Sequence, residues 1–334
     1  MEAQRMVETV GAAKQWLRTV RVGEGMHSKN LTIFPLYWEG EKAKASSESA
    51  PSWGEGEVDG GRKARYQLLA DAIEAKQARV EETSESGDVP LLAVRNDGST
   101  PMLFPEGEIL IGAKKNRTVN LTLLVAAKTQ MQMPVRCVEA GRWSRSSRHF
   151  EAKAWAHPKL RELKVRSAQS YRRETGMARA DQSAVWKEVD DHLDDFDIPA
   201  PTRDLALSFE EPAVYTSEYR ERIELPESAC GFLAARGDEV IGLDLFDSAQ
   251  TLQKLWRRMS DAYFVEAARG DERLEETPGN VASKFLSAVE DRLVPAAKQP
   301  QLGFEMELVD GALAGSALWY DGAICHLSAF STNN

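Results

Sequence analysis

Short apolar runs separated by turn signals dominate residues 89–143. Between the turns, apolar and polar positions alternate and β-branched residues are frequent, which predicts antiparallel strands. The runs are Leu91–Val94, Met102–Phe104, Ile109–Ile111, Val119–Val125 and Met133–Val138. The same pattern predicts further strands at Leu31–Trp38, Arg79–Thr83, Tyr215–Leu225, Gly231–Ala235, Glu239–Asp244, Leu302–Val309, Ala314–Tyr320 and Ala323–Phe330.

Other segments carry apolar residues at the three- and four-residue spacing of an amphipathic helix. The predicted helices are Met1–Val20, Tyr66–Ala78, Asp181–Phe196, Ser248–Ala268 and Val281–Val294. The basic segment 144–173 is too irregular for one long helix, and we expect Pro158 to interrupt it. Two interpretations of that segment stay open: an anion-binding arm, or a solvated helix and loop.

These elements predict an α+β fold with antiparallel sheets and helices packed against them. We expect an N-terminal helical extension over residues 1–28, a first half over 29–200 and a second half over 201–334, which join into one domain. Three prolines between Pro199 and Pro212 mark the crossover between the halves. Residues 39–63 are rich in Gly, Ser and Glu and bury little apolar surface, so we expect a mobile surface loop there.

Composition narrows the function. The net charge is −10 and 28% of the residues are charged, which indicates a soluble protein and argues against a general nucleic-acid binder. No apolar run approaches the ~18 residues that cross a bilayer, and the charged N-terminus does not resemble a signal peptide. Three widely spaced cysteines fit a cytoplasmic protein with reduced thiols, and no membrane partner is expected.

An unusual polar set crowds the turns of residues 106–143. Glu106 and Glu108 lie two apart, so in a strand they point to one side, and Gly107 lets another group come close. Carboxylates, cations and amides inside a strongly apolar sheet need partners or a ligand. We therefore place the candidate functional face on this β-unit.

Named motifs for phosphate loops, dinucleotide binding, zinc proteases and nucleophile elbows are absent from the sequence. The acidic run Asp190–Asp197 has no calcium-loop spacing, so we expect a solvated acidic face. His192 within it lacks a second histidine at helical ligand spacing. No metal site is predicted, and the sequence identifies no cofactor.

The runs GEILIGAKKNRTVN and PVRCVEAGRW resemble the signature of the ADP-ribosylglycohydrolase and rhodanese-phosphatase associated domain family. NLTIFPLYW, ADQSAVWKEV, DEVIGLDLF and AICHLSAF extend the resemblance in order along nearly the whole chain. The family usually has Gln where this chain has Lys115. The resemblance implies a bacterial domain that binds or processes an ADP-ribose or NAD-derived metabolite. If such a domain is an enzyme, the resemblance implies a hydrolase of ADP-ribose derivatives.

We assign the candidate residues on these grounds. A mixed carboxylate and arginine site would use acids for general acid or base chemistry, cations for a pyrophosphate and an aromatic ring for adenine. The catalytic candidates are Glu106, Glu108 and Glu139. The ligand-binding candidates are Lys114, Asn116, Arg117, Asn120, Arg142, Trp143 and His326.

An alternative interpretation makes the same polar set structural. Arg117, Glu139 and Arg142 would then form an ion-pair network inside a non-catalytic interaction module. In that case the partner would be a protein rather than a small nucleotide.

Overall fold

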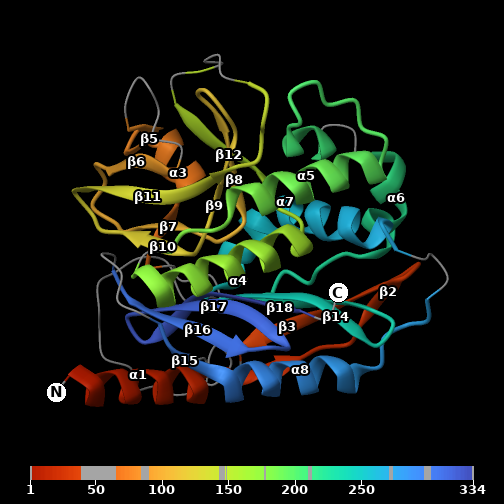
Figure 1. Ribbon diagram of the computed structural model, residues 1–334. Helices are drawn as coiled ribbons and strands as arrows, with labels where there is room; N and C mark the ends of the chain where they lie inside the picture. The colour runs from red at the N-terminus through yellow and green to blue at the C-terminus, as the bar shows by residue number, and fades with distance from the viewer. Residues whose placement is uncertain are drawn as a thin grey trace.

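The computed structural model describes residues 2–38, 65–83, 90–142, 147, 149–176, 178–209, 213–270, 274–296 and 302–332. The predicted loop 39–63 lies outside these residues. Helices and sheets alternate as layers: two helices at the base, a large sheet, a second set of helices, and a smaller β-unit at the top (Figure 1). The α+β fold with antiparallel sheets is confirmed.

The large sheet has nine strands in the order β1-β3-β13-β14-β18-β17-β16-β15, with β2 paired to β3. All of its pairs are antiparallel. The strands are β1 (Val20–Val22), β2 (Met26–Ser28), β3 (Leu31–Trp38), β13 (Gly231–Arg236), β14 (Glu239–Phe246), β15 (Leu293–Pro295), β16 (Phe304–Asp310), β17 (Leu313–Tyr320) and β18 (Ala323–Ser331). This sheet therefore takes strands from both halves of the sequence.

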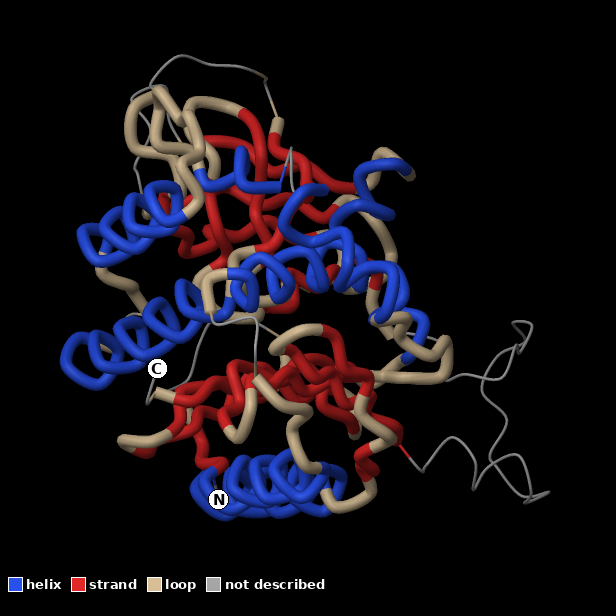
Figure 2. Tube along the Cα trace, turned by 90° about the vertical axis from the view of Figure 1, so that its right-hand side faces the viewer, coloured by secondary structure: helices blue, strands red, loops and turns tan. Residues whose placement is uncertain are grey.

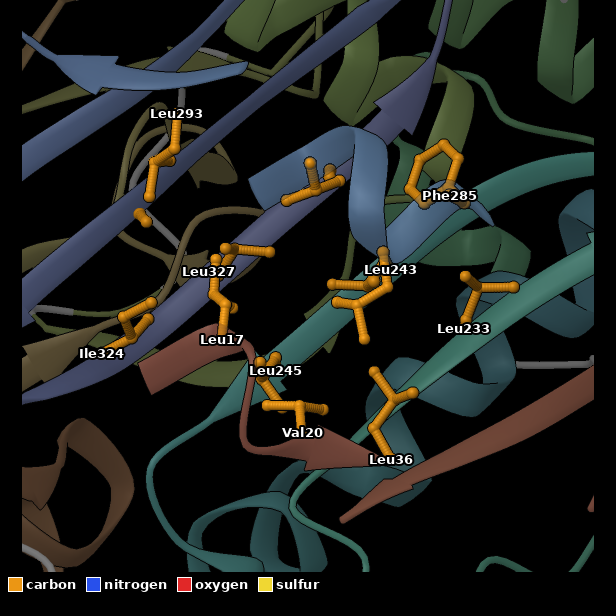
Figure 3. Close-up of a cluster of buried hydrophobic side chains, with 14 of the residues drawn as sticks. Leu17, Val20, Leu36, Leu233, Leu243, Leu245, Phe285, Leu293, Ile324 and Leu327 are labelled. Atoms are coloured by element: carbon orange, nitrogen blue, oxygen red, sulfur yellow. The ribbon is translucent and has the colours of Figure 1, made fainter. Parts of the chain in front are cut away.

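Helices α1 (Glu2–Leu17) and α8 (Gly279–Arg292) cover the outer face of the large sheet (Figure 2). Leu17 and Phe285 pack there against Leu243 of β14 in one apolar cluster (Figure 3). Because strand side chains alternate, neighbouring residues of β14, Asp244 among them, point to the opposite face. That opposite face lies toward the helices of the middle layer.

The middle layer consists of α4 (Pro158–Thr175), α6 (Ala213–Arg222) and α7 (Ala249–Ala268). Leu252, Leu255 and Met259 of α7 pack on the inner face of the large sheet in a second apolar cluster. Helix α4 runs across β17, β18 and β14 (Figure 1). Its first residue is Pro158, which suits a helix start because the missing N–H has no partner there in any helix.

The smaller β-unit has a six-stranded sheet, β12-β8-β9-β11-β6-β5, and a three-stranded sheet, β10-β7-β4. One apolar cluster fills the space between them and α3 (Leu69–Glu74). The strands are β4 (Gln67–Leu68), β5 (Ala78–Glu82), β6 (Leu91–Asn96), β7 (Met102–Phe104), β8 (Glu108–Gly112), β9 (Arg117–Val119), β10 (Leu123–Val125), β11 (Thr129–Cys137) and β12 (Phe150–Trp155).

Helix α5 (Gln182–Asp195) and the 3-10 helix η1 (Leu205–Phe209) complete the fold beside the β-unit. Asp181 caps α5, since its side chain accepts hydrogen bonds from the backbone N–H groups of Ser183 and Ala184. Helix α4 ends at Thr175 and its C-cap Gly176 has the left-handed conformation. Helices α4 and α5 pack together as a hairpin of helices.

Several element predictions were wrong. The segment Tyr215–Leu225 lies largely in helix α6, and its buried residues Thr216, Tyr219 and Ile223 are three and four positions apart, as in a helix. The predicted helix Tyr66–Ala78 is shortened to α3, because Gln67 and Leu68 pair in parallel with β7. Pro158 begins a helix rather than interrupting one. The predicted strand Val119–Val125 divides into β9 and β10, and β12 was missed.

In the part of the chain that the structure describes, no helix is both long and apolar enough to span a membrane.

Candidate functional site

A buried charge network lies where α4, the large sheet and the β-unit meet. We call it the interlayer network: Glu106, Thr122, Arg161, Lys164, Asp244, Tyr263 and His326. At its centre Arg161 Nε donates to Glu106 Oε2 at 2.9 Å, while Nη1 and Nη2 donate to the two oxygens of Asp244 at 2.8 and 2.6 Å. The side chains of Arg161, Glu106 and Asp244 are fully buried.

Local sequence explains how these groups meet. Arg161 and Lys164 are three residues apart in α4 and so share one helix face. Gly107 has φ +89°, a conformation that favours glycine, and a Cβ there would lie 2.5 Å from Arg161 Nε. The sequence predicts a close approach at Gly107, and the approaching group is the Arg161 side chain.

His326 of the large sheet connects Asp244 to Thr122 of the β-unit. Its Nε2 lies 3.0 Å from Asp244 Oδ1, and its Nδ1 lies 2.6 Å from Thr122 Oγ1. Thr122 Oγ1 also accepts a hydrogen bond from the backbone N–H of Glu106, and Tyr263 donates its hydroxyl hydrogen to Asp244. A Thr–His–Asp chain therefore exists here, but each of the three residues is at most 3% exposed.

The pKa shifts fit a closed set of ion pairs. Burial lowers the pKa of Lys164 to about 8, although Glu106 at 3.1 Å favours the charged form. Burial alone would raise the pKa of Asp244, but the Arg161 guanidinium holds it well below its usual range. Two cations face two carboxylates, so the network is balanced in charge and joins three layers of the fold.

A second group, the turn cluster, comprises Lys115, Asn116, Glu139, Arg142 and Asp204. Arg142 donates to both oxygens of Glu139, at 2.8 and 2.7 Å. Asn116 Nδ2 donates to Asp204 Oδ2 at 2.8 Å, and the backbone N–H of Asn116 donates to Glu139. Lys115 donates to the carbonyl of Ala140, and its Nζ lies 5.5 Å from the centre of the Trp186 ring.

Asp204 is the titratable group of interest in the turn cluster. Burial raises its pKa to about 6, against the hydrogen bonds from Ala206 and Asn116 that favour the carboxylate. The backbone of Asp204 pairs with that of Glu139 in an isolated antiparallel bridge, which places the Glu139 carboxylate beside that of Asp204. The turn between β8 and β9 is therefore fixed to the end of β11 and to the chain before η1.

The remaining predicted residues lie elsewhere. Glu108 binds Arg258 at 3.0 Å, and burial raises the pKa of Glu108. Arg117 contacts Glu82 at 3.3 Å and the Cys137 thiol at 2.8 Å. Lys114 is half-buried in the β8–β9 turn.

Asn120 is 1% exposed, and neither amide atom has a hydrogen-bond partner among the described residues. Trp143 lies outside the described residues. The structure therefore brings Glu106 and His326 together in the interlayer network, and Asn116, Glu139 and Arg142 together in the turn cluster.

A hollow of about 790 Å³ opens on the other side of α4, at the loop end of the α4–α5 hairpin. We call it the hairpin hollow. Among the residues that line it are three arginines, a tyrosine, two acids and an amide: Arg136, Arg166, Arg179, Tyr171, Glu174, Asp181 and Gln182. Gln182 also bonds both backbone groups of Cys137, which ties the start of α5 to β11.

Sequence reasoning missed Arg161, Lys164 and Thr122, and it left Asp244 open between a carboxylate role and a helix cap. Asp244 lies within β14 and does not cap α7, whose N-cap is Ser248. The hairpin hollow was not predicted from the sequence either. The available signal was the pair of cations three residues apart in a segment that starts with Pro158, but a solvated helix face has the same pattern.

The comparisons with known proteins give one match. The model of the ARG and Rhodanese-Phosphatase-superfamily-associated Protein domain matches residues 19–330. No curated protein and no solved structure matches the chain significantly. The matched range contains the interlayer network, the turn cluster and the hairpin hollow.

Proposed function

The chain belongs to the ARG and Rhodanese-Phosphatase-superfamily-associated Protein domain family, and we propose that it binds an ADP-ribose-type metabolite in the hairpin hollow. The observation that carries the proposal is the presence of three arginines among the residues that line a hollow of about 790 Å³. Small-molecule sites usually measure ~300–1,000 Å³, so the hollow has room for a dinucleotide-sized ligand.

The arginines supply the charge that a diphosphate needs. Arg136 is 2% exposed and is held by hydrogen bonds to the carbonyls of Ala180 and Val135, so its guanidinium is positioned in advance. Burial and then the nearby charge of Arg179 lower the pKa of Arg136 to about 10, which leaves it charged at neutral pH. Two like charges that repel one another favour an anion between them, and guanidinium groups bind phosphate oxygens in pairs.

The other lining groups suit the rest of such a ligand. The half-buried ring of Tyr171 offers a stacking surface for an adenine base. The exposed carboxylates of Glu174 and Asp181 accept hydrogen bonds from ribose hydroxyls. The hollow therefore provides one type of group for each part of ADP-ribose.

The catalytic roles of Glu106, Glu108 and Glu139 stay predictions. All three carboxylates are at most 2% exposed and are bound to arginine or lysine side chains. If any of them takes part in turnover, its Glu→Gln variant will lose hydrolysis of ADP-ribose while it retains ADP-ribose binding. Full turnover by all three variants would reject the roles.

Titration calorimetry with ADP-ribose, ADP, NAD and free ribose tests the proposal. We expect binding of the diphosphates and none of ribose. Arg166→Ala or Arg179→Ala should weaken ADP-ribose binding about tenfold to a hundredfold, because each removes a charge-assisted hydrogen bond of ~1.5–3 kcal/mol. Both side chains are exposed, so the fold should persist.

The matched control is Arg95→Ala, which removes an exposed arginine from β6. Its affinity for ADP-ribose should equal that of the unchanged protein. The proposal fails if ADP-ribose does not bind, or if the Arg166 and Arg179 variants bind as tightly as the Arg95 control.

A further inference from the structure

Two histidines far apart in sequence stack at the open end of the α4–α5 hairpin. His157 is the N-cap of α4 and His192 lies in the last turn of α5. Their ring centres are 4.4 Å apart and the planes differ by 11°. Both residues are fully buried. This histidine pair therefore holds the end of α5 against the start of α4.

Charged groups from α4, α5 and α7 surround the histidine pair. His157 Nδ1 lies 2.8 Å from Glu266 of α7, and its Nε2 lies 3.9 Å from Glu188 of α5. Two cations face the same carboxylates: Lys159 of α4 lies 3.5 Å from Glu188, and Arg269, just after α7, lies 2.8 Å from it. Arg269 also lies 2.6 Å from Asp195 of α5, so the carboxylates around the imidazoles already pair with cations.

His192 has no means of stabilising a proton where it lies. Phe196 packs against its other side with ring centres 5.2 Å apart. Neither of its nitrogens has a hydrogen-bond partner among the described residues. An imidazolium at His192 would lie 4.4 Å from the His157 ring without an acceptor, a state that burial penalises heavily.

We propose that the histidine pair is a pH-sensitive latch: acidification releases α5 from α4 and α7, and so regulates the hairpin hollow at the far end of the same two helices. The effect on ligand binding rests on the function proposed above, whereas the release of α5 does not. Asp181 and Gln182 at the start of α5 line the hollow, so displacement of α5 alters its wall.

The direction of the pH effect follows from the lowered pKa of His192. Burial and then the neighbouring His157 lower the pKa of His192 well below its usual 6.5. The released form therefore binds a proton at a higher pH than the latched form. The latch is fully stable above about pH 6.5, and release becomes roughly tenfold more favourable for each pH unit below it, until the lowered pKa is reached.

Native-state hydrogen exchange of the full chain at pH 7.5 and 5.0, corrected for intrinsic exchange rates, tests the latch without any ligand. We expect protection of the second half of α5 to fall by about thirtyfold in the unchanged protein, from the same proton linkage. His192→Phe keeps an aromatic ring between His157 and Phe196 and should abolish this pH dependence. His192→Leu serves the same purpose should the larger ring fail to fit. His149→Phe, at a side chain that is 45% exposed, is the matched control and should behave as the unchanged protein.

Protection that is equal at the two pH values, or a pH dependence that survives in both His192 variants, overturns the latch. In parallel, the affinity for ADP-ribose is measured by calorimetry. It should weaken at pH 5.0 in the unchanged protein and stay the same at both pH values in His192→Phe. Absence of ADP-ribose binding at either pH rejects the proposed function, while the exchange experiment still decides the latch. If α5 is released at pH 5.0 but the affinity for ADP-ribose is the same at both pH values, the proposed regulation of the hollow is wrong.

Discussion

Replacement of Arg161 by methionine is the most informative perturbation of the interlayer network. Methionine replaces the aliphatic stem of the arginine inside the fold but removes the guanidinium that bonds Glu106 and both oxygens of Asp244. Both carboxylates are fully buried and would lose the guanidinium without facing bulk solvent. Removal of one partner from a buried ion pair typically costs ~3–5 kcal/mol.

The remaining contacts limit the loss. Lys164 still pairs with Glu106 at 3.1 Å, and His326 and Tyr263 still bind Asp244. We therefore expect Arg161→Met to lower the free energy of unfolding by about 3–5 kcal/mol rather than more. Domains are commonly stable by only ~5–15 kcal/mol, so the change should be plain in urea denaturation followed by circular dichroism.

Arg166→Ala on the same helix is the control, because that side chain is 60% exposed and its ion pair is worth less than ~1 kcal/mol. Asp244→Asn in the Arg161→Met background should recover part of the loss, since it removes the carboxylate left without its partner. If Arg161→Met costs no more than the Arg166 variant, or if the double variant shows purely additive losses, the reasoning is wrong.

Three further predictions concern a glycine, an aspartate and the cysteines. Gly107→Ala should destabilise the protein by about 1–3 kcal/mol in urea denaturation, because it combines a positive φ with a clash at Arg161, whereas Gly311→Ala, with nothing within 4 Å, should be nearly neutral. The raised pKa of Asp204 means that its carboxylate destabilises the fold as it ionises, so relative to Asp204→Asn the unchanged protein should lose up to ~3 kcal/mol of stability as the pH rises from about 4 to 6. All three cysteines are buried, and burial raises the pKa of the Cys137 thiol, so thiol reagents should label none of them until the protein unfolds; rapid labelling under native conditions would contradict their burial.

Much of the fold was predictable from local pattern. Leu31–Trp38 and the three C-terminal strands alternate or run apolar between clear turns, and each forms a strand in the structure. The helix over 181–196 was equally clear because a capping Asp precedes an apolar stripe. The strand predicted at 215–225 was wrong because residue types alternate there, whereas the residues that become buried have the spacing of a helix.

The site was predictable only in part, for a physical reason. Whether a charged residue faces water or a buried partner depends on a residue that can lie anywhere in the sequence. Arg161 is buried because Asp244 meets it from β14, and His192 is buried because His157 meets it from α4. Glu139 and Arg142 lie only three residues apart, so local sequence was enough to suggest that they meet. Local sequence could not predict partners that lie far apart in the chain.

The place of β3 in the large sheet has a consequence during synthesis. β3 leaves the ribosome early, yet it pairs with β13 and shares a core with strands near the C-terminus. The nascent chain must keep one edge of this apolar strand unpaired until β13 emerges, whereas the β-unit can complete its mostly local pairings first. A chain cut at residue 200 would hold β1 to β3 without their neighbour and should aggregate rather than fold as an independent half.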